Sequence, residues 1–241
     1  KVVLPNTITS LGKYSFERCT SLTALDIPTS VKSIGKNAFN GCSSLIKIVI
    51  PEGVTILDNF TFFGCSSLTE ISIPSSVVHF GNGVFESCAS LETIDIPANL
   101  KKVGKMTFKD CLSLSSITIP SSITSIPEDS FSNCESLTKV TIPSSVTDIG
   151  SNAFFNCKSL TGVSIPSSVK SIGDSSFSQC ASLTKIEIPS SVSKIGKSAF
   201  YDCHSLVEVS MQSSVYSIGP AAFQKCSSLM SIKLSDSIKE I

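Results

Sequence analysis

Residues 160–180 read LTGVSIPSSVKSIGDSSFSQC, and the same pattern of apolar, proline, glycine, phenylalanine and cysteine positions returns every 23 residues. A chain that repeats one short unit cannot close an ordinary globular core, so each unit has to bury its apolar side against its neighbours. The sequence therefore predicts a single repeat domain over residues 1–241, with about ten 23-residue units. The units are marked by Cys19, Cys42, Cys65, Cys88, Cys111, Cys134, Cys157, Cys180, Cys203 and Cys226.

The two ends of the chain lie inside this pattern. The chain begins with Lys1 rather than methionine and stops at Ile241, partway through a unit, so we expect a fragment of a longer protein. The first residues show no signal-peptide pattern, and no stretch approaches the ~18 apolar residues of a membrane span. We expect membrane association only through segments outside this chain.

The charge balance argues against a nucleic-acid partner. Lys+Arg and Asp+Glu both number 19, and the isoelectric point is near 6.9. Binding to a phosphate backbone needs an excess of basic residues, which this chain lacks. Hydrophobic residues make up 41% of the chain, which is enough for a continuous apolar interior.

Each unit contains a short alternation of inward apolar and outward polar residues, such as Ile186-Glu187-Ile188, which is typical of a half-buried strand. We therefore expect one strand per unit. Proline follows the strand in nine units, from Pro5 to Pro189, where it cannot donate to a strand ladder and so ends the pairing. Gln212 and Ser235 take its place in the last two units.

The second half of each unit predicts turns. A glycine column that includes Gly35 and Gly173 is expected to supply a positive φ, and Asp58 and Pro127 interrupt it, so we expect two turns to differ locally. Residues 36–42 suit a short helical turn on the side opposite the strands. Additional aromatic residues in this half are expected to be partly buried rather than to form an exposed patch: Phe60, Phe63, Phe155 and Tyr201.

Taken together, these columns resemble the BspA-like leucine-rich repeat, whose unit reads L-x-x-L-x-L-P-x-x-L-x-x-I-G-x-x-A-F-x-x-C-x-x. The match runs through the whole chain, in register. The resemblance implies a repeat solenoid that is right-handed and curved, with a parallel β-sheet on the concave face; the short turns and helical segments would lie on the convex face. It also implies the usual role of the family, in surface or secreted proteins of microbes that contact host cells, neighbouring cells or matrix proteins.

The cysteine column invites disulfide and metal interpretations, and the period argues against both. Equivalent residues of adjacent coils lie roughly 4.8 Å apart with parallel Cβ vectors, whereas a disulfide needs Cβ atoms about 3.8 Å apart that point toward each other. Zinc needs ligands that converge from several directions, which a line of single thiols does not offer. We expect buried, reduced thiols and neither metal nor cofactor.

No catalytic constellation is recognisable. His79 and His204 occupy different columns about five coils apart, so they cannot share a site. Ser167-x-x-Lys170 and Ser191-x-x-Lys194 match a nucleophile motif formally, but such matches arise by chance in a chain rich in Ser-Ser turns. We therefore expect no enzymatic activity.

The outward strand positions are the candidate partner-binding surface. They are short and mixed in charge, which suits a protein or a glycan bound through distributed hydrogen bonds on the concave face. We expect an adhesion module at the cell surface or in secreted form; the alternatives are a cytoplasmic protein-interaction scaffold and a spacer without a ligand. The candidate residues are Lys47, Glu70, Asp95, Lys139, Lys185, Glu187, Glu208 and Lys233.

Overall fold

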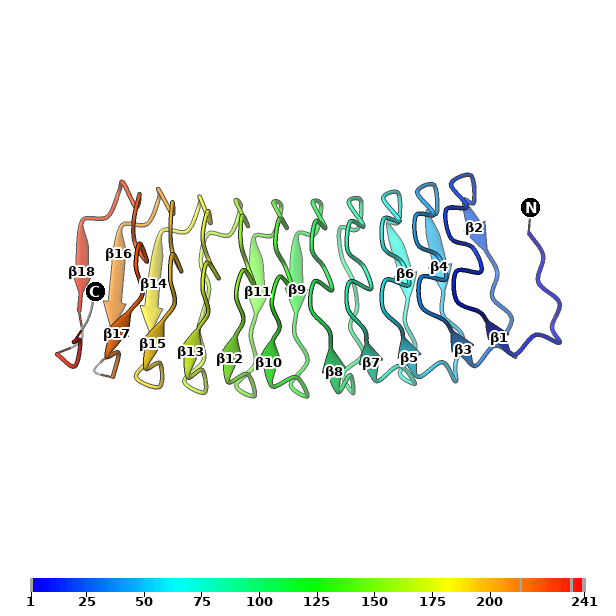
Figure 1. Ribbon diagram of the computed structural model, residues 1–241, viewed down its shortest axis with the longest axis horizontal. Helices are drawn as coiled ribbons and strands as arrows, with labels where there is room; N and C mark the ends of the chain where they lie inside the picture. The colour runs from blue at the N-terminus through cyan, green and yellow to red at the C-terminus, as the bar shows by residue number, and fades with distance from the viewer. Residues whose placement is uncertain (1, 213, 235, 240–241) are drawn as a thin grey trace. The chain divides into compact units, whose positions relative to one another are not determined.

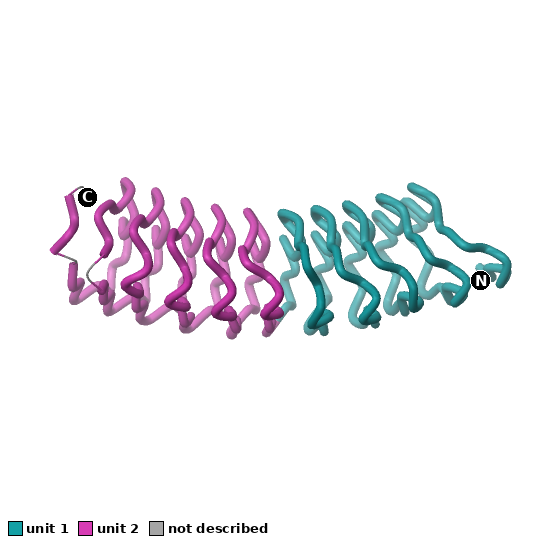
Figure 2. The backbone as a smooth tube through the Cα atoms, turned by 90° about the horizontal axis from the view of Figure 1, so that it is seen from below, with its two compact units in different colours: residues 1–114 teal, residues 115–241 magenta. Residues whose placement is uncertain are grey.

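The computed structural model describes residues 2–212, 214–234 and 236–239. These residues form strands and turns, with no helix among them. They divide into two compact units, Lys1–Leu114 and Ser115–Ile241, which Figure 2 shows in teal and magenta. Each unit is a β-solenoid of stacked coils, so the solenoid expectation is confirmed.

The predicted strands after the leucine column form parallel ladders within each unit (Figure 1). In the first unit the order is β2 (Ala24–Leu25), β4 (Lys47–Val49) and β6 (Glu70–Ser72). In the second unit β9 (Ser116–Thr118) pairs with β11 (Lys139–Thr141), and β14 (Lys185–Ile188), β16 (Glu208–Met211) and β18 (Ser231–Lys233) form a three-stranded sheet. We call the outward side of these strands and of the equivalent residues in the other coils the long-strand face; it is the surface that the sequence analysis predicts as concave.

Register follows the repeat, because each residue pairs with the residue one unit further along. Lys185 is opposite Glu208, and Ile186 is opposite Val209. The inward side chains are buried: Ile186 is 3% exposed and Val209 is 1% exposed. The expected alternation of inward apolar and outward polar residues is therefore confirmed in these strands.

Most coils contain a second strand that the sequence analysis missed. In the first unit these strands are β1 (Ser10–Leu11), β3 (Ser33–Ile34), β5 (Ile56–Leu57), β7 (His79–Phe80) and β8 (Lys102–Val103). In the second unit they are β10 (Ser125–Ile126), β12 (Asp148–Ile149), β13 (Ser171–Ile172), β15 (Lys194–Ile195) and β17 (Ser217–Ile218). Each is only two residues long, which is too short for an alternation to show in the sequence. The expectation of one strand per unit was wrong.

The helical turn expected at residues 36–42 and its equivalents was also wrong, because backbone donors there serve two different coils. The amide of Tyr14 donates to the Lys36 carbonyl oxygen at 3.1 Å, and the amide of Phe16 donates to the Ala38 carbonyl oxygen at 2.8 Å. The intervening amides bond within their own coil, as from Glu17 to Tyr14. A continuous α-helix would keep every donor within one segment.

Positive φ values occur in this segment rather than at the glycine column. Asn152 has φ 54° and Asn156 has φ 58°, and equivalent residues of the other units share this conformation. Gly173 is instead required by close approach, since a Cβ there would lie 2.6 Å from the carbonyl carbon of Gly150. The positive φ predicted for this column was wrong, and Pro127 needs no exceptional φ there.

Two side-chain columns fill the core beside the turn segment. Neighbouring phenylalanine rings stack within each unit, as Phe154 does on Phe177 with centroids 5.2 Å apart. Within each unit, buried thiols reach back to the preceding coil, so that Cys157 Sγ donates to the Phe131 carbonyl oxygen at 3.2 Å. All ten cysteines lie in the described ranges and are free thiols; eight of them are buried, while Cys19 is exposed and Cys226 is half-buried. The prediction that the thiols are buried is confirmed for those eight.

We predict that Cys157→Ala lowers the free energy of unfolding by about 2 kcal/mol, because it removes buried volume and leaves the Phe131 carbonyl oxygen without its thiol donor. Urea unfolding followed by circular dichroism measures the change. Cys19→Ala is the matched control: this thiol is exposed, so the change should stay within about 0.5 kcal/mol. Equal effects at the two sites would contradict the role assigned to the thiol.

We predict that Gly173→Ala destabilises the protein by about 1–3 kcal/mol, because the added methyl group would press against the backbone of the preceding coil. Gly162→Ala should change the free energy of unfolding by less than about 1 kcal/mol, because a Cβ there meets no heavy atom within 4 Å. Thermal unfolding of the two variants tests the difference, and similar midpoints would refute the close-approach explanation.

We predict that alkaline pH weakens the fold through the buried thiols. Burial raises the pKa of Cys180 to about 12, from an ordinary value of 9.0. Above pH 9 the unfolded chain therefore releases this proton while the folded chain retains it, so stability falls as pH rises until about pH 12. Between pH 10 and 11, Cys180→Ala should reduce the slope of unfolding free energy against pH by about 1.4 kcal/mol per pH unit. An unchanged slope would show that this thiol ionises equally in both states.

Candidate functional site

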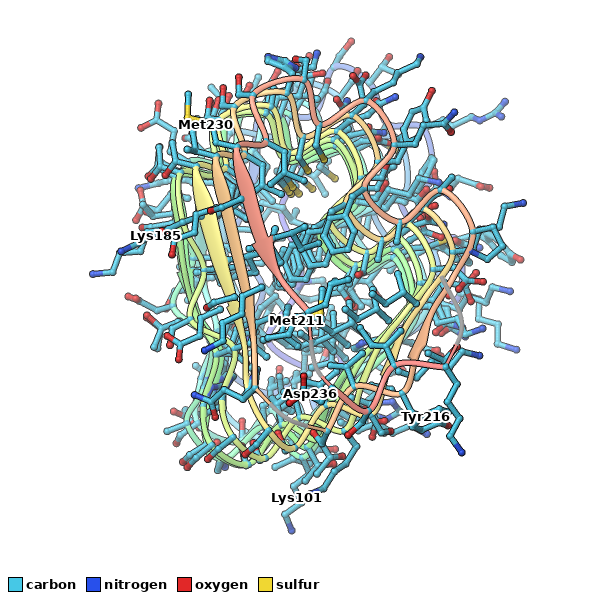
Figure 3. All side chains as sticks on the ribbon, turned by 90° about the vertical axis from the view of Figure 1, so that its left-hand side faces the viewer. Lys101, Lys185, Met211, Tyr216, Met230 and Asp236 are labelled. Carbon is cyan, nitrogen blue, oxygen red and sulfur yellow. The ribbon has the colours of Figure 1, made fainter. Side chains whose placement is uncertain are left out.

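All eight residues of the predicted binding surface are exposed on the long-strand face. The first unit contributes Lys47 in β4, Glu70 in β6 and Asp95 in a coil without a strand. The second contributes Lys139 in β11, Lys185 and Glu187 in β14, Glu208 in β16 and Lys233 in β18. Viewed along the chain in Figure 3, Lys185 projects outward from its strand, whereas Met211 points into the core.

The strand ladder of this face ends at β6 in the first unit and is interrupted between β11 and β14 in the second. Residues 93–96 form no strand in the first unit, and residues 162–165 form none in the second, although both segments are described. In the second unit, β11 pairs only with β9, and β14 pairs only with β16. The coil that contains Gly162 therefore lies between two strand edges without belonging to either sheet.

A groove of about 610 Å³ opens at this interruption. Residues 162–165 form one wall, and the other is formed by β14 and β16 with the polar side chains of Lys185, Glu187, Glu208 and Gln212. Gly162 occupies the same column as Lys139 and Lys185, so the groove lies where neighbouring coils carry long side chains. Its volume falls in the range that is common for ligand sites.

The charged groups of the groove are only partly paired. The Gln212 amide Nε2 donates to Glu187 Oε1 at 3.1 Å, which holds this carboxylate in place. Lys185 and Glu208 are neighbours in register, but neither makes an ion pair in the described part of the chain. Two carboxylates and one ammonium group are thus presented to solvent from adjacent strands.

Sequence reasoning identified the three charged residues of the groove but missed what surrounds them. Gly162 is the only glycine in its column, which was the available signal for a gap. Gln212 was noted only as a missing proline. Its backbone amide donates to the Ile188 carbonyl oxygen at 3.0 Å, a bond that proline cannot make, while its side chain orients Glu187. The other replacement of a proline, Ser235, lies outside the described residues.

The remaining reactive groups do not converge on a site. His79 lies in β7 of the first unit, and burial together with the nearby Lys102 lowers its pKa, against the opposing effect of Asp58; His204 is exposed in the second unit. No group of three or more His, Cys, Asp or Glu side chains that could hold a metal ion occurs among the described residues. Within the same residues, there is no helix with the length and apolar character needed to cross a membrane.

The additional aromatic residues lie back against the turn segment, as expected. Phe60, Phe63, Phe155 and Tyr201 are all half-buried. Phe60 and Phe63 meet edge to face with centroids 6.0 Å apart, and Lys225 Nζ lies 5.0 Å from the centroid of the Tyr201 ring. These contacts leave no continuous aromatic patch at these four residues.

Comparisons with known proteins agree with this architecture. The family model described as BspA type leucine rich repeat region matches residues 1–115 and 101–230, in six copies. A leucine rich repeat protein from T. pallidum is 32% identical, with a TM-score of 0.63 over 66% of this chain and 77% of that chain. The search among curated proteins found no match.

Two further solved structures cover almost the whole chain. A leucine rich cell surface protein from Faecalibacterium prausnitzii is 28% identical, with a TM-score of 0.58 over 95% of this chain and 77% of that chain. A leucine-rich repeat protein from Eubacterium ventriosum is 26% identical, with a TM-score of 0.63 over 96% of this chain and 71% of that chain. The chain is thus a repeat module of a kind that mediates protein interactions.

Proposed function

Because the chain belongs to the BspA-type leucine-rich repeat family, we propose that it is a non-enzymatic recognition and adhesion module of a microbial cell-surface or secreted protein. It binds proteins or glycans of host cells, neighbouring cells or matrix through the long-strand face. The observation that carries this proposal is the set of exposed charged side chains that each unit presents on this face, together with the groove between β14 and the coil of Gly162 in the second unit.

The chemistry of the face supports recognition by distributed polar contacts. In each unit, a lysine on one strand lies opposite a glutamate on the next strand: Lys47 is opposite Glu70, and Lys185 is opposite Glu208. A surface of mixed charge selects partners by complementary charge rather than by bulk attraction to a polyanion. The description of the similar Faecalibacterium prausnitzii structure as a cell surface protein supports the proposed location.

A cytoplasmic interaction scaffold is the second candidate, and the free thiols favour it. None of the ten cysteines, all of which are described, forms a disulfide, as is usual in reducing compartments. Burial weakens this argument, because thiols that oxidants cannot reach persist outside cells as well. Antibody labelling of intact and permeabilised cells that express the parent protein separates the two locations.

We predict that Lys139→Glu combined with Lys185→Glu weakens binding to extracellular-matrix proteins or glycans at least about tenfold, because it reverses two exposed charges of the long-strand face. Surface plasmon resonance against purified matrix proteins and a glycan array measures the effect. The matched control combines Lys170→Glu with Lys194→Glu, which makes the same charge change at exposed positions outside this face. If a partner binds both double variants as tightly as the unaltered protein, binding does not occur on the long-strand face. If no matrix protein or glycan binds the unaltered protein, the adhesion function is contradicted.

A further inference from the structure

We infer that the groove between β14, β16 and residues 162–165 binds an arginine side chain carried by an extended peptide segment of the partner. The inference rests on the proposed function and names the chemistry that one part of the long-strand face recognises. The groove lies wholly within the second compact unit. It is therefore complete in one folded unit of the chain.

Charge is the first argument for a cationic guest. Glu187 and Glu208 face the groove against the single ammonium group of Lys185, so its charged lining carries a net negative charge. Neither Glu208 nor Lys185 makes an ion pair in the described chain, so the Glu208 carboxylate is available to a guest. Lys185 at the same wall attracts an acidic residue that follows or precedes the arginine.

Geometry favours a guanidinium group over a simple ammonium group. Glu208 is on β16, one strand spacing of roughly 4.8 Å from the position of Lys185, and Glu187 lies two residues, about 7 Å, further along β14. Both residues are exposed on the long-strand face, so their carboxylates are presented side by side from the same face of the sheet. A planar guanidinium group with five N–H donors can serve two carboxylates together, whereas an ammonium group binds as a point charge.

One of the two carboxylates is already oriented. Gln212 Nε2 donates to Glu187 Oε1 at 3.1 Å, which restricts the rotation of this side chain and leaves its second oxygen for a guest. Ordering a long side chain on binding costs conformational entropy, so an orientation that exists before binding increases affinity. This contact depends on Gln212, which replaces the proline of most other units.

The lining favours a peptide over a glycan. No aromatic side chain lines this groove, all of whose lining residues are described, so a sugar ring would find no flat apolar surface to stack on. Hydroxyl groups of Ser164 and Ser210 instead offer hydrogen bonds to a polypeptide backbone. The groove volume of about 610 Å³ accommodates an arginine side chain together with flanking residues.

The test uses capped pentapeptide libraries of the form Xaa-Xaa-Arg-Xaa-Xaa with a fluorescent label, and fluorescence anisotropy as the readout. Matched libraries replace arginine by citrulline, which keeps the shape without the charge, or by lysine. The protein variants are Glu208→Gln, which removes one carboxylate, and Gly162→Gln, which places a side chain in the groove. Because a Cβ at Gly162 meets no heavy atom within 4 Å, this second variant should fold normally. Glu52→Gln is the control, because it makes the same change at an exposed carboxylate of the first unit that lies outside the long-strand face.

We expect the arginine library to bind at least about tenfold more tightly than the citrulline library, and more tightly than the lysine library. Glu208→Gln and Gly162→Gln should each remove most of this preference, and Glu52→Gln should leave it unchanged. Equal binding of arginine and citrulline would overturn the inference, as would an arginine preference that survives Gly162→Gln. Binding of a glycan probe that Gly162→Gln abolishes, with no peptide signal, would overturn the peptide assignment.

These results separate the inference from the proposed function. A matrix protein that the Lys139→Glu and Lys185→Glu double variant no longer binds, but that Gly162→Gln binds normally, would refute the arginine site and leave the adhesion module standing. A partner panel that yields no binding while the peptide libraries show the expected preference would refute the adhesion function and leave the site.

Discussion

The hydrogen bond from a buried cysteine thiol to a phenylalanine carbonyl oxygen in the preceding coil, which recurs within both units, is the constraint on which the stack depends. It joins residues 26 apart, as from Cys180 to Phe154 at 3.2 Å, so it sets the spacing between coils and also satisfies a buried acceptor. The phenylalanine rings beside it stack at 5.2 Å to 5.8 Å within the two units. The phenylalanine rings can stack and the thiols can reach their acceptors only if both residue types recur with the same period. This requirement explains why neither the phenylalanine nor the cysteine column is interrupted.

Because the contacts between coils are made by inward side chains, the outward strand positions are free to vary. The inward residues, such as Ile186 and Val209, are almost fully buried and similar from coil to coil, whereas their outward neighbours change charge and size. A single outward glycine, at position 162, is tolerated because the core beneath it remains filled. The same substitution inside the phenylalanine or cysteine column would remove a contact between two coils. Recognition can therefore diversify on this face without destabilising the stack.

Much of this fold could be predicted from the sequence, because a strict period turns each column into a repeated contact. The strands of the long-strand face, the prolines that end them and the buried thiols follow from residue type and spacing, whereas the two-residue second strands are too short to leave a pattern. The turn segment could not be derived in this way: alternate amides bond to the next coil, and positive φ occurs at residues as different as Tyr14 and Asn152. The glycine column was misread, because a close approach between backbones leaves the same sequence signal as a positive φ. The candidate site was predictable only in part, since the contact between Gln212 and Glu187 joins residues 25 apart on adjacent coils.

The state of the thiols tests the central claim most directly, and the S–H stretching band in the Raman spectrum of the native protein reports it. The account predicts a dominant band shifted to low frequency by hydrogen bonding and slow to exchange in D₂O, with a minor, fast-exchanging band from the exposed Cys19. The account also predicts that this low-frequency band disappears when the protein unfolds. A native spectrum dominated by thiols without hydrogen bonds, or by rapid exchange, would contradict the account.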